Sequence, residues 1–233
     1  GICERNGQVY VADENRILVF SRFGELKKSL VSPKLRNAKA VHVTHNGDVY
    51  VADNQNWVII VFDVLGNQIK EINVHMPVVD IDICPATGDI LALGPRRLLV
   101  ITRCGNIRQV FESMFVKAFA VRYVGKHIAV SDPKAGVVVL FSRSKLIPKN
   151  TLSVGRNPRG LATGARGELL VVSGGSRSKN ISAFNIENNQ VLWSFVASPS
   201  SNPNHISFTP SRQSVFFCDW QQGPCVNEIE VIG

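Results

Sequence analysis

Arginine and lysine recur in the short polar segments that separate the apolar runs of this sequence. Twelve of these cations fall in such segments: Arg16, Lys34, Arg36, Lys39, Arg96, Arg97, Lys117, Lys134, Arg156, Arg159, Arg177 and Lys179. The arginine guanidinium donates paired hydrogen bonds to phosphate oxygens and stacks on planar rings. Glu14 is the acidic residue found among these segments. This composition is typical of a surface that contacts phosphate groups.

Aromatic residues lie among these cations. Trp57 and Trp220 fall in polar segments between apolar runs, and Phe115 precedes another run. An exposed ring beside arginine can stack on an unpaired base of single-stranded or hairpin RNA. The alternative is that the three rings pack between layers of the fold. Asparagine and glutamine are also frequent in these segments, where they either form turns or hydrogen-bond base edges.

The net charge supports an anionic partner. The chain contains 26 Lys and Arg against 18 Asp and Glu, a formal net charge of +8, and it has no charged tail. Such an excess on a compact protein favours a polyanion such as RNA. An acidic protein partner is the alternative, because carboxylates and phosphates both attract arginine.

The segments that must position these cations repeat along the chain. Residues 47–66 contain two runs rich in β-branched and aromatic residues, separated by a polar loop and bounded by glycines. Related segments are found at residues 7–24, 88–105, 125–132, 167–173 and 213–219. Six copies at a spacing of about 40 residues predict an all-β, six-bladed β-propeller with four strands in each blade.

The predicted strand order assigns each loop to one end of its blade. Loops between second and third strands leave at the same end as the connections between blades, so the twelve cations are expected on one face. The opposite face has mixed charge. Fourth strands are expected at residues 25–30, 67–72 and 106–111. Aspartates end four second strands, where we expect them to hydrogen-bond the loop backbone: Asp13, Asp53, Asp132 and Asp219.

The two ends of the chain fit the same repeat. Residues 1–6 align with a first strand and residues 227–232 with a third strand, so the last blade is expected to lack its outer strand. The chain starts at Gly1, inside a repeat and without a methionine. We therefore expect residues 1–233 to be a single propeller domain from a longer protein.

The repeat resembles the NHL repeat. Its second strand is matched by Val11-Ala12-Asp13 and by Val51-Ala52-Asp53, and its third strand by Val19-Phe20 and Val61-Phe62. Gly94 and Ser173 depart from the pattern, because they stand where the aspartate is expected. The resemblance covers essentially the whole chain and is strongest in the first two blades.

The resemblance implies a six-bladed propeller of the kind found at the C-terminus of tripartite-motif E3 ubiquitin ligases, several of which bind RNA through one face. It also implies protein substrates as further partners, and a parent protein that oligomerises through a coiled coil. The chain has no RING or B-box zinc ligands, so ubiquitin-ligase activity would reside outside it. The resemblance therefore predicts a recognition module, with a propeller that recruits an acidic partner or ubiquitylation substrate as the alternative.

The sequence predicts no catalysis in this domain. Some six-bladed propellers are metal-dependent enzymes, with ligands where first strands enter the central channel. The corresponding positions in this chain, aligned on the prolines between blades, are Ala40, Val79, Ala118, Gly160 and His205. One histidine, even with His75, falls short of three zinc ligands. Asp80 and Asp82 share one face of a strand, but no partner base is apparent. We expect no cofactor and no metal.

The cysteines and hydropathy favour a cytoplasmic protein. The five cysteines are an odd number without a CxxC pair, so we expect free, buried thiols in a reducing compartment. No apolar run is long enough for a membrane span, and we expect no membrane partner.

Overall fold

A computed structural model of the chain describes residues 1–112, 115–175, 179–197, 203–209, 213–219 and 225–230. These residues form β-strands and no helix, which confirms the predicted all-β class. The chain divides into two compact units, Gly1–Ser113 and Met114–Gly233, called here the N-terminal and C-terminal units. That residues 1–233 form one domain stays a prediction.

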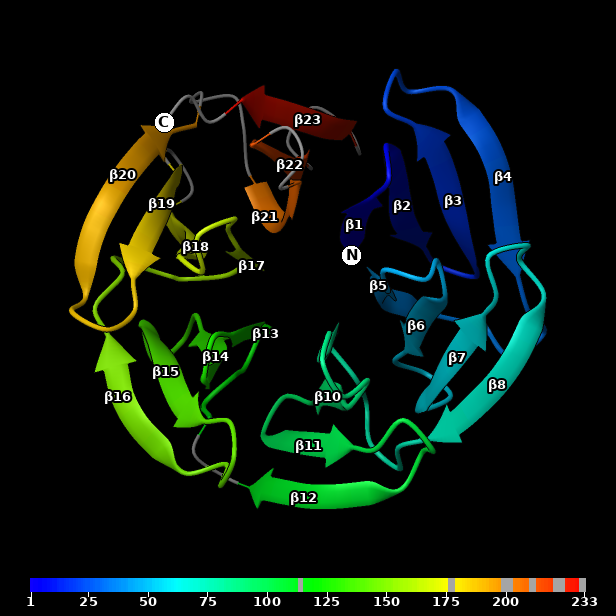
Figure 1. Cartoon of the computed structure of the whole chain (residues 1–233), viewed down its shortest axis with the longest axis horizontal. Helices are drawn as coiled ribbons and strands as arrows, with labels where there is room; N and C mark the ends of the chain where they lie inside the picture. The colour runs from blue at the N-terminus through cyan, green and yellow to red at the C-terminus, as the bar shows by residue number, and fades with distance from the viewer. Residues whose placement is uncertain (113–114, 176–178, 198–202, 210–212, 220–224, 231–233) are drawn as a thin grey trace. The chain divides into compact units, whose positions relative to one another are not determined.

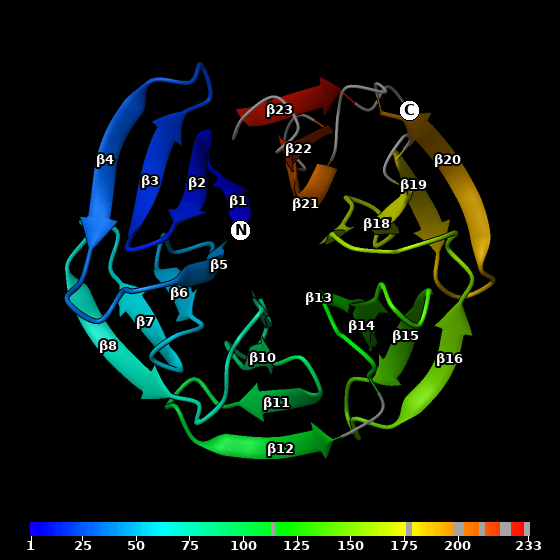
Figure 2. The ribbon, with the colours of Figure 1, turned by 180° about the vertical axis from the view of Figure 1, so that it is seen from behind.

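The N-terminal unit contains three antiparallel four-stranded sheets, each with its strands in chain order (Figures 1 and 2). The first consists of β1 (Ile2–Arg5), β2 (Gln8–Asp13), β3 (Arg16–Ser21) and β4 (Leu26–Val31). The second consists of β5 (Ala38–Val43), β6 (Val49–Asp53), β7 (Val58–Phe62) and β8 (Gln68–Asn73). The third consists of β9 (Asp80–Ile83), β10 (Ile90–Leu93), β11 (Arg97–Ile101) and β12 (Ile107–Glu112). The predicted fourth strands are confirmed, each beginning one residue later than expected.

The C-terminal unit also contains three antiparallel sheets. The first consists of β13 (Ala120–Val124), β14 (His127–Asp132), β15 (Val137–Ser142) and β16 (Pro148–Leu152). The second consists of β17 (Leu161–Thr163), β18 (Leu169–Gly174), β19 (Lys179–Asn185) and β20 (Gln190–Val196). The third has three strands among the described residues: β21 (Pro203–Thr209), β22 (Ser214–Asp219) and β23 (Cys225–Glu230). The prediction that the last blade lacks its outer strand is confirmed.

Neighbouring sheets within a unit pack face to face. In β6, Val49 and Val51 join the core shared with the first sheet, whereas Tyr50 and Ala52 join the core shared with the third. Both faces of this sheet are buried, so the side chains on both faces of the strand are apolar, as expected for a strand covered on two sides. Burial of each such aliphatic side chain stabilises the folded state by about 1.5–3 kcal/mol relative to leaving it exposed.

The glycine that begins five of the six repeats makes the turn between the first and second strands. Gly47 has a φ of 90° and Gly88 a φ of 71°, values that strain any residue with a side chain. A Cβ atom on Gly47 would also lie 3.1 Å from Val64 Cγ2. The turn fixes the register of the hairpin, and the aspartate six residues after Gly47 therefore lies at the far end of β6.

Tyr10 and Tyr50 occupy equivalent positions, three residues after the turn glycine, and burial raises the pKa of both hydroxyls. The charge of Asp48 raises the pKa of Tyr50 further. Because the pKa of these hydroxyls is raised in the folded state, the neutral tyrosines contribute stability to the fold. This contribution is fully present below the unfolded pKa of about 10 and is lost as pH rises through the folded pKa. We predict that absorbance at 295 nm titrates at higher pH in the native protein than in denaturant. Coinciding midpoints would contradict the prediction.

Each of the five fourth strands shows the same irregularity. The pairing with the third strand shifts by one residue near the start of the fourth, as between Val19 and Phe20 in β3. One residue of each fourth strand is left without a partner at this shift, and these bulge residues are Lys27, Ile69, Arg108, Lys149 and Leu192. Bulges and charges are devices that protect a sheet edge from pairing with another chain.

The cysteines that the structure describes with their side chains form no disulfide bond. Cys84 and Cys218 are buried, as predicted, and Cys3 is partly buried. The prediction is wrong for Cys104, which is exposed in the turn between β11 and β12. The described residues include no helix that is long and apolar enough to cross a membrane.

Candidate nucleic-acid interface

In the N-terminal unit, Asp53 at the end of β6 is fully buried and connects two loops. Its Oδ2 accepts hydrogen bonds from the backbone N–H groups of Arg36 and Asn37, both at 2.7 Å, in the connection before β5. Its Oδ1 accepts from the N–H groups of Gln55 at 3.0 Å and Asn56 at 2.7 Å, in the β6–β7 loop. Hydrogen bonds to a charged acceptor are stronger than neutral ones, so Asp53 fixes both loops.

In the C-terminal unit, Asp132 at the end of β14 also connects two loops, and it is 1% exposed. Its carboxylate accepts from the N–H groups of Val116 at 2.5 Å and Lys117 at 3.2 Å, before β13. It also accepts from Lys134 and Ala135, both at 3.1 Å, in the β14–β15 loop. The predicted role of the strand-end aspartates is therefore confirmed for Asp53 and Asp132.

Acidic side chains neutralise three of the predicted cations. The pairs are Arg16 Nε with Asp13 Oδ2 at 2.9 Å, Lys34 Nζ with Glu71 Oε1 at 3.3 Å, and Arg97 Nη2 with Glu112 Oε1 at 2.5 Å. Asp13 thus differs from Asp53 and Asp132, and the side chain of Asp219 lies outside the described residues. The expectation of one acid beside twelve cations is wrong, because Glu71 and Glu112 reach the loops from outer strands. These exposed pairs contribute about 0–1 kcal/mol each to stability.

Arg36, Lys39 and Arg96 are exposed and form no ion pair with any described residue. Lys39 is the bulge residue of β5 and not a loop residue as predicted, and it follows the connection that carries Arg36. Backbone contacts join this connection to the neighbouring loops. The Ala38 N–H donates to the Glu14 carbonyl at 2.5 Å, and the Asn54 N–H donates to the Asn37 carbonyl at 3.0 Å.

The contacts continue to the third sheet. The Asn54 side-chain amide donates to the Val78 carbonyl at 3.0 Å, and the Val79 N–H donates to the Leu93 carbonyl at 2.7 Å, beside the β10–β11 turn that contains Arg96. The N-terminal unit therefore presents its unpaired cations on loops that contact one another.

In the C-terminal unit, Lys117, Lys134 and Arg156 are exposed and likewise form no ion pair with any described residue. Arg159 is partly buried. Its Nη1 donates to Asn204 Oδ1 at 2.9 Å and its guanidinium lies 5.4 Å from the centre of the Phe119 ring. Arg159 therefore has a structural role, and fewer of its donors are available to a phosphate than predicted.

The prediction that Lys179 belongs to an exposed loop is wrong. Lys179 is the first residue of β19 and is 4% exposed. Its Nζ donates to the Pro203 carbonyl at 2.8 Å and to Asn204 Oδ1 at 3.0 Å, which connects β19 to β21. Arg177 lies outside the described residues. Lys179 is therefore a packing residue that cannot reach a ligand in solution.

We predict that Lys179→Met lowers the stability of the protein by about 1–3 kcal/mol, because it leaves buried acceptors without their donor. RNA affinity of the folded variant should stay within about twofold of wild type, because the ammonium contacts no phosphate. Thermal denaturation and RNA titration measure the two effects. A large loss of affinity without loss of stability would show that Lys179 is accessible after all.

The three aromatic residues predicted to stack on bases differ in their environment. Trp57 is 48% exposed in the β6–β7 loop, and its φ of 60° is strained for a bulky side chain. Phe115 is buried and packs edge-on against Phe141, with ring centres 5.9 Å apart, which supports the structural alternative for this ring. Trp220 lies outside the described residues. Trp57 is therefore the ring available for stacking, and strain is often retained at functional positions.

We predict that Trp57→Asn leaves stability unchanged or raises it, because asparagine tolerates positive φ better than tryptophan. The same change should weaken binding of single-stranded RNA by about 5–100-fold, the equivalent of one stacked base. A denaturant titration and an RNA titration of the same preparation measure both. Unchanged RNA affinity would assign the exposed ring to another role.

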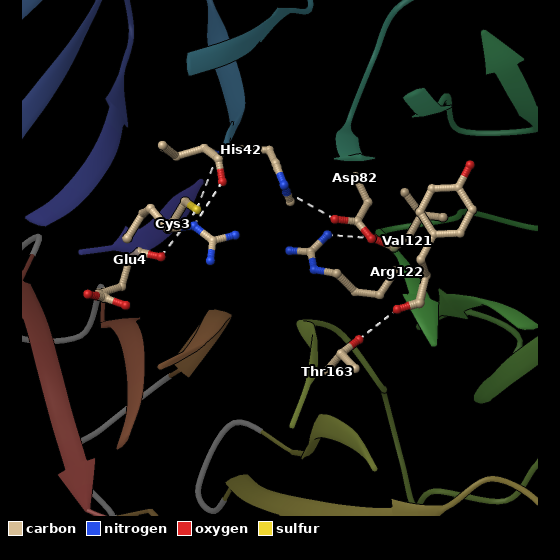
Figure 3. A network of polar contacts seen from close by, with 10 residues as sticks. Cys3, Glu4, His42, Asp82, Val121, Arg122 and Thr163 are labelled. Atoms are coloured by element: carbon tan, nitrogen blue, oxygen red, sulfur yellow. Dashed lines mark hydrogen bonds and ion pairs between the residues drawn. The ribbon is translucent and has the colours of Figure 1, made fainter. Parts of the chain in front are cut away.

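Figure 3 shows a network of polar contacts, and it includes a pair that the sequence prediction missed. His42 Nδ1 on β5 lies 3.0 Å from Asp82 Oδ1 on β9, with 20% and 8% of the side chains exposed. His42 is paired across the antiparallel strands with Tyr50, and Asp82 is paired with Leu91. Tyr50 and Leu91 each follow their turn glycine by three residues. His42 precedes its turn glycine by five residues and Asp82 by six, so their equivalence follows from the strand pairing and not from alignment of the sequence on these glycines. The inference that Asp82 lacks a partner base is wrong.

This pair does not complete a metal site in the part of the chain that the structure describes. No three His, Cys, Asp or Glu side chains among the described residues are close enough together to hold a metal ion. His205 stacks on Phe119 with ring centres 4.9 Å apart. That the domain is not an enzyme stays a prediction.

Comparison with solved structures identifies the class of fold. The chain is similar to the Cps50 (Swd1) β-propeller domain of Myceliophteria thermophila, with a TM-score of 0.71, 14% identity, and coverage of 99% of this chain and 96% of that one. It is also similar to a Bacteroides caccae protein of unknown function, with a TM-score of 0.75, 16% identity and coverage of 97% and 90%. A third similar structure is virginiamycin B lyase from Staphylococcus aureus, with a TM-score of 0.73, 16% identity and coverage of 99% and 83%.

These similarities and the six sheets show that the chain is a six-bladed β-propeller. At 14–16% identity they establish the fold alone. No protein-family model matches the sequence, and no curated protein matches it. Membership of the NHL family stays a prediction.

Proposed function

We propose that this β-propeller binds RNA through the exposed cations of its loops. Six exposed cations form no ion pair with any described residue: Arg36, Lys39, Arg96, Lys117, Lys134 and Arg156. They are called here the free cations. Three of them lie in each unit, and phosphate is the anion that several flexible cations on fixed loops are suited to bind.

The observation that carries the proposal is the burial of Asp53 and Asp132. Each carboxylate accepts four backbone hydrogen bonds and is at most 1% exposed. These negative charges hold the loops from beneath and are not available to form ion pairs with the side chains above them. The loops therefore expose positive charge and bury the negative charge that positions it.

Single-stranded or hairpin RNA is favoured over duplex DNA by Trp57. An exposed indole next to cations stacks on an unpaired base, and unpaired bases are presented by RNA loops. The β6–β7 loop that contains Trp57 contacts the connection that carries Lys34, because Asn56 Nδ2 donates to the Lys34 carbonyl at 2.7 Å, and the Trp57 carbonyl accepts from the Val74 N–H at 3.0 Å.

The ion pairs support one alternative, capture of an acidic protein partner or ubiquitylation substrate. Arg16, Lys34 and Arg97 already bind carboxylates of this chain. An acidic peptide could replace these intramolecular partners. The NHL-like repeats lead us to propose further that the chain is the recognition module of a cytoplasmic, tripartite-motif-like E3 ubiquitin ligase.

Competition separates the two functions. A labelled single-stranded RNA should bind the protein, and unlabelled RNA should displace it at concentrations at least about tenfold below those required for a polyglutamate peptide of equal charge, because stacking adds to the RNA affinity alone. Equal displacement by both would favour the acidic-partner function. Failure to bind any RNA at low salt would contradict the proposal.

A further inference from the structure

β20 differs from the other fourth strands in its charge. It reads QVLWSFV and contains no Asp, Glu, Lys or Arg. Every other fourth strand contains at least one basic residue: β4 reads LKKSLV, β8 QIKEIN, β12 IRQVFE and β16 PKNTL. Charged residues on an edge strand prevent it from pairing with another chain, and β20 lacks this protection.

β20 is also apolar where it is exposed. Val191 is 57% exposed, Leu192 53%, Phe195 39% and Val196 65%. The strand lies at the edge of its sheet, and no described strand pairs with its outer side (Figure 1). The bulge residue of β20 is Leu192, whereas β4, β12 and β16 have Lys27, Arg108 and Lys149 at the equivalent position.

We propose that β20 pairs with β20 of a second copy of this chain, as antiparallel edge strands related by a twofold axis. In such a pair the strand meets its own sequence reversed, so residues near the twofold axis lie close to their own copies. Self-pairing through β4 in the register that places Lys27 opposite Lys28 of the second copy would be repulsive. β20 has apolar or uncharged residues along its whole length, so self-pairing brings no like charges together in any register.

β20 has no charge that would attract an acidic or basic peptide, whereas a second copy presents a strand of the same uncharged, apolar composition. An interface of one strand per copy is small, so the dimer is expected to be weak. The proposal does not depend on RNA binding. A dimer would nevertheless present two sets of free cations to one RNA and increase its avidity.

Sedimentation velocity over a concentration series tests the proposal. The protein should show a saturable monomer–dimer equilibrium, and Leu192→Lys should weaken it at least about tenfold, because it places like charges at the paired edges. The matched control is Ile69→Lys on β8, which adds the same charge at the equivalent bulge position, where the side chain is 57% exposed. The control should leave the equilibrium unchanged.

Hydrogen exchange of the wild-type protein is a second readout that requires no variant. Backbone amides of residues 190–196 should become more protected as concentration rises through the dimerisation range. A protein that stays monomeric throughout would overturn the proposal. So would open-ended aggregation, a dimer that Leu192→Lys leaves intact, or equal disruption by Ile69→Lys.

Discussion

Reversing the three free cations of the N-terminal unit, in the variant Arg36→Glu, Lys39→Glu and Arg96→Glu, is expected to weaken RNA binding by about 100–1000-fold at moderate salt. Each reversal removes a phosphate contact and adds a repulsion. The three side chains are exposed and have no ion pair to lose in the described structure, so the fold should tolerate the change. RNA titration by fluorescence anisotropy measures the loss, and thermal denaturation confirms folding.

The control for this variant is a reversal at the opposite ends of the sheets. Arg22, in the turn between β3 and β4, stacks over Phe23 at 4.5 Å, and Arg143, just after β15, stacks over Tyr123 at 5.1 Å. The double variant Arg22→Glu and Arg143→Glu should bind RNA within about threefold of wild type, because only nonspecific attraction is lost. Equal losses in both variants would show that the net charge drives binding and that the loops do not.

Asp53→Ala is expected to be the most destabilising single substitution in these loops. It removes a buried carboxylate and leaves four backbone N–H groups without their acceptor. A buried donor without a partner costs about 1–3 kcal/mol. Water entering the space would satisfy some of them, so we expect a total loss of about 3–5 kcal/mol in the free energy of unfolding.

Asp13→Ala is the matched control, because Asp13 occupies the same position of its repeat and, among the described residues, its carboxylate pairs with the exposed Arg16 alone. Its loss should be below about 1 kcal/mol. Chemical denaturation of the two variants measures the difference. If both variants lost a similar free energy of unfolding, the four hydrogen bonds of Asp53 would stabilise the protein no more than an exposed ion pair does.

The repeat was enough to predict the strands and the ends of each sheet. Glycine has to occupy the tight turn at Gly47, and the alternation of Tyr50 and Val51 between two cores accounts for the continuous apolar runs. These are local requirements that recur in each repeat. The three fourth strands that the sequence predicts, β4, β8 and β12, begin within one residue of their expected positions for the same reason.

The side-chain partners could not be predicted from the repeat. Glu71 lies on β8, and its long side chain carries the carboxylate to Lys34 in an earlier segment. Glu112 on β12 lies directly opposite Arg97 on β11, so this pair follows from the strand register. The sequence prediction places Lys179 in a loop, but β19 begins at this residue and buries it. For Lys34 and Lys179 the partner comes from a distant part of the chain, which a count of charges in loops does not include.

The salt dependence of RNA binding tests the central proposal most directly. For single-stranded RNA the logarithm of the association constant should fall linearly with the logarithm of salt concentration, by about 0.7 for each phosphate contact. Contacts from the three free cations of one unit predict a slope of about −2, and contacts from all six predict about −4. A slope in this range that moves toward zero in the variant Arg36→Glu, Lys39→Glu and Arg96→Glu is the expected result. A slope near zero in the wild-type protein would contradict the account.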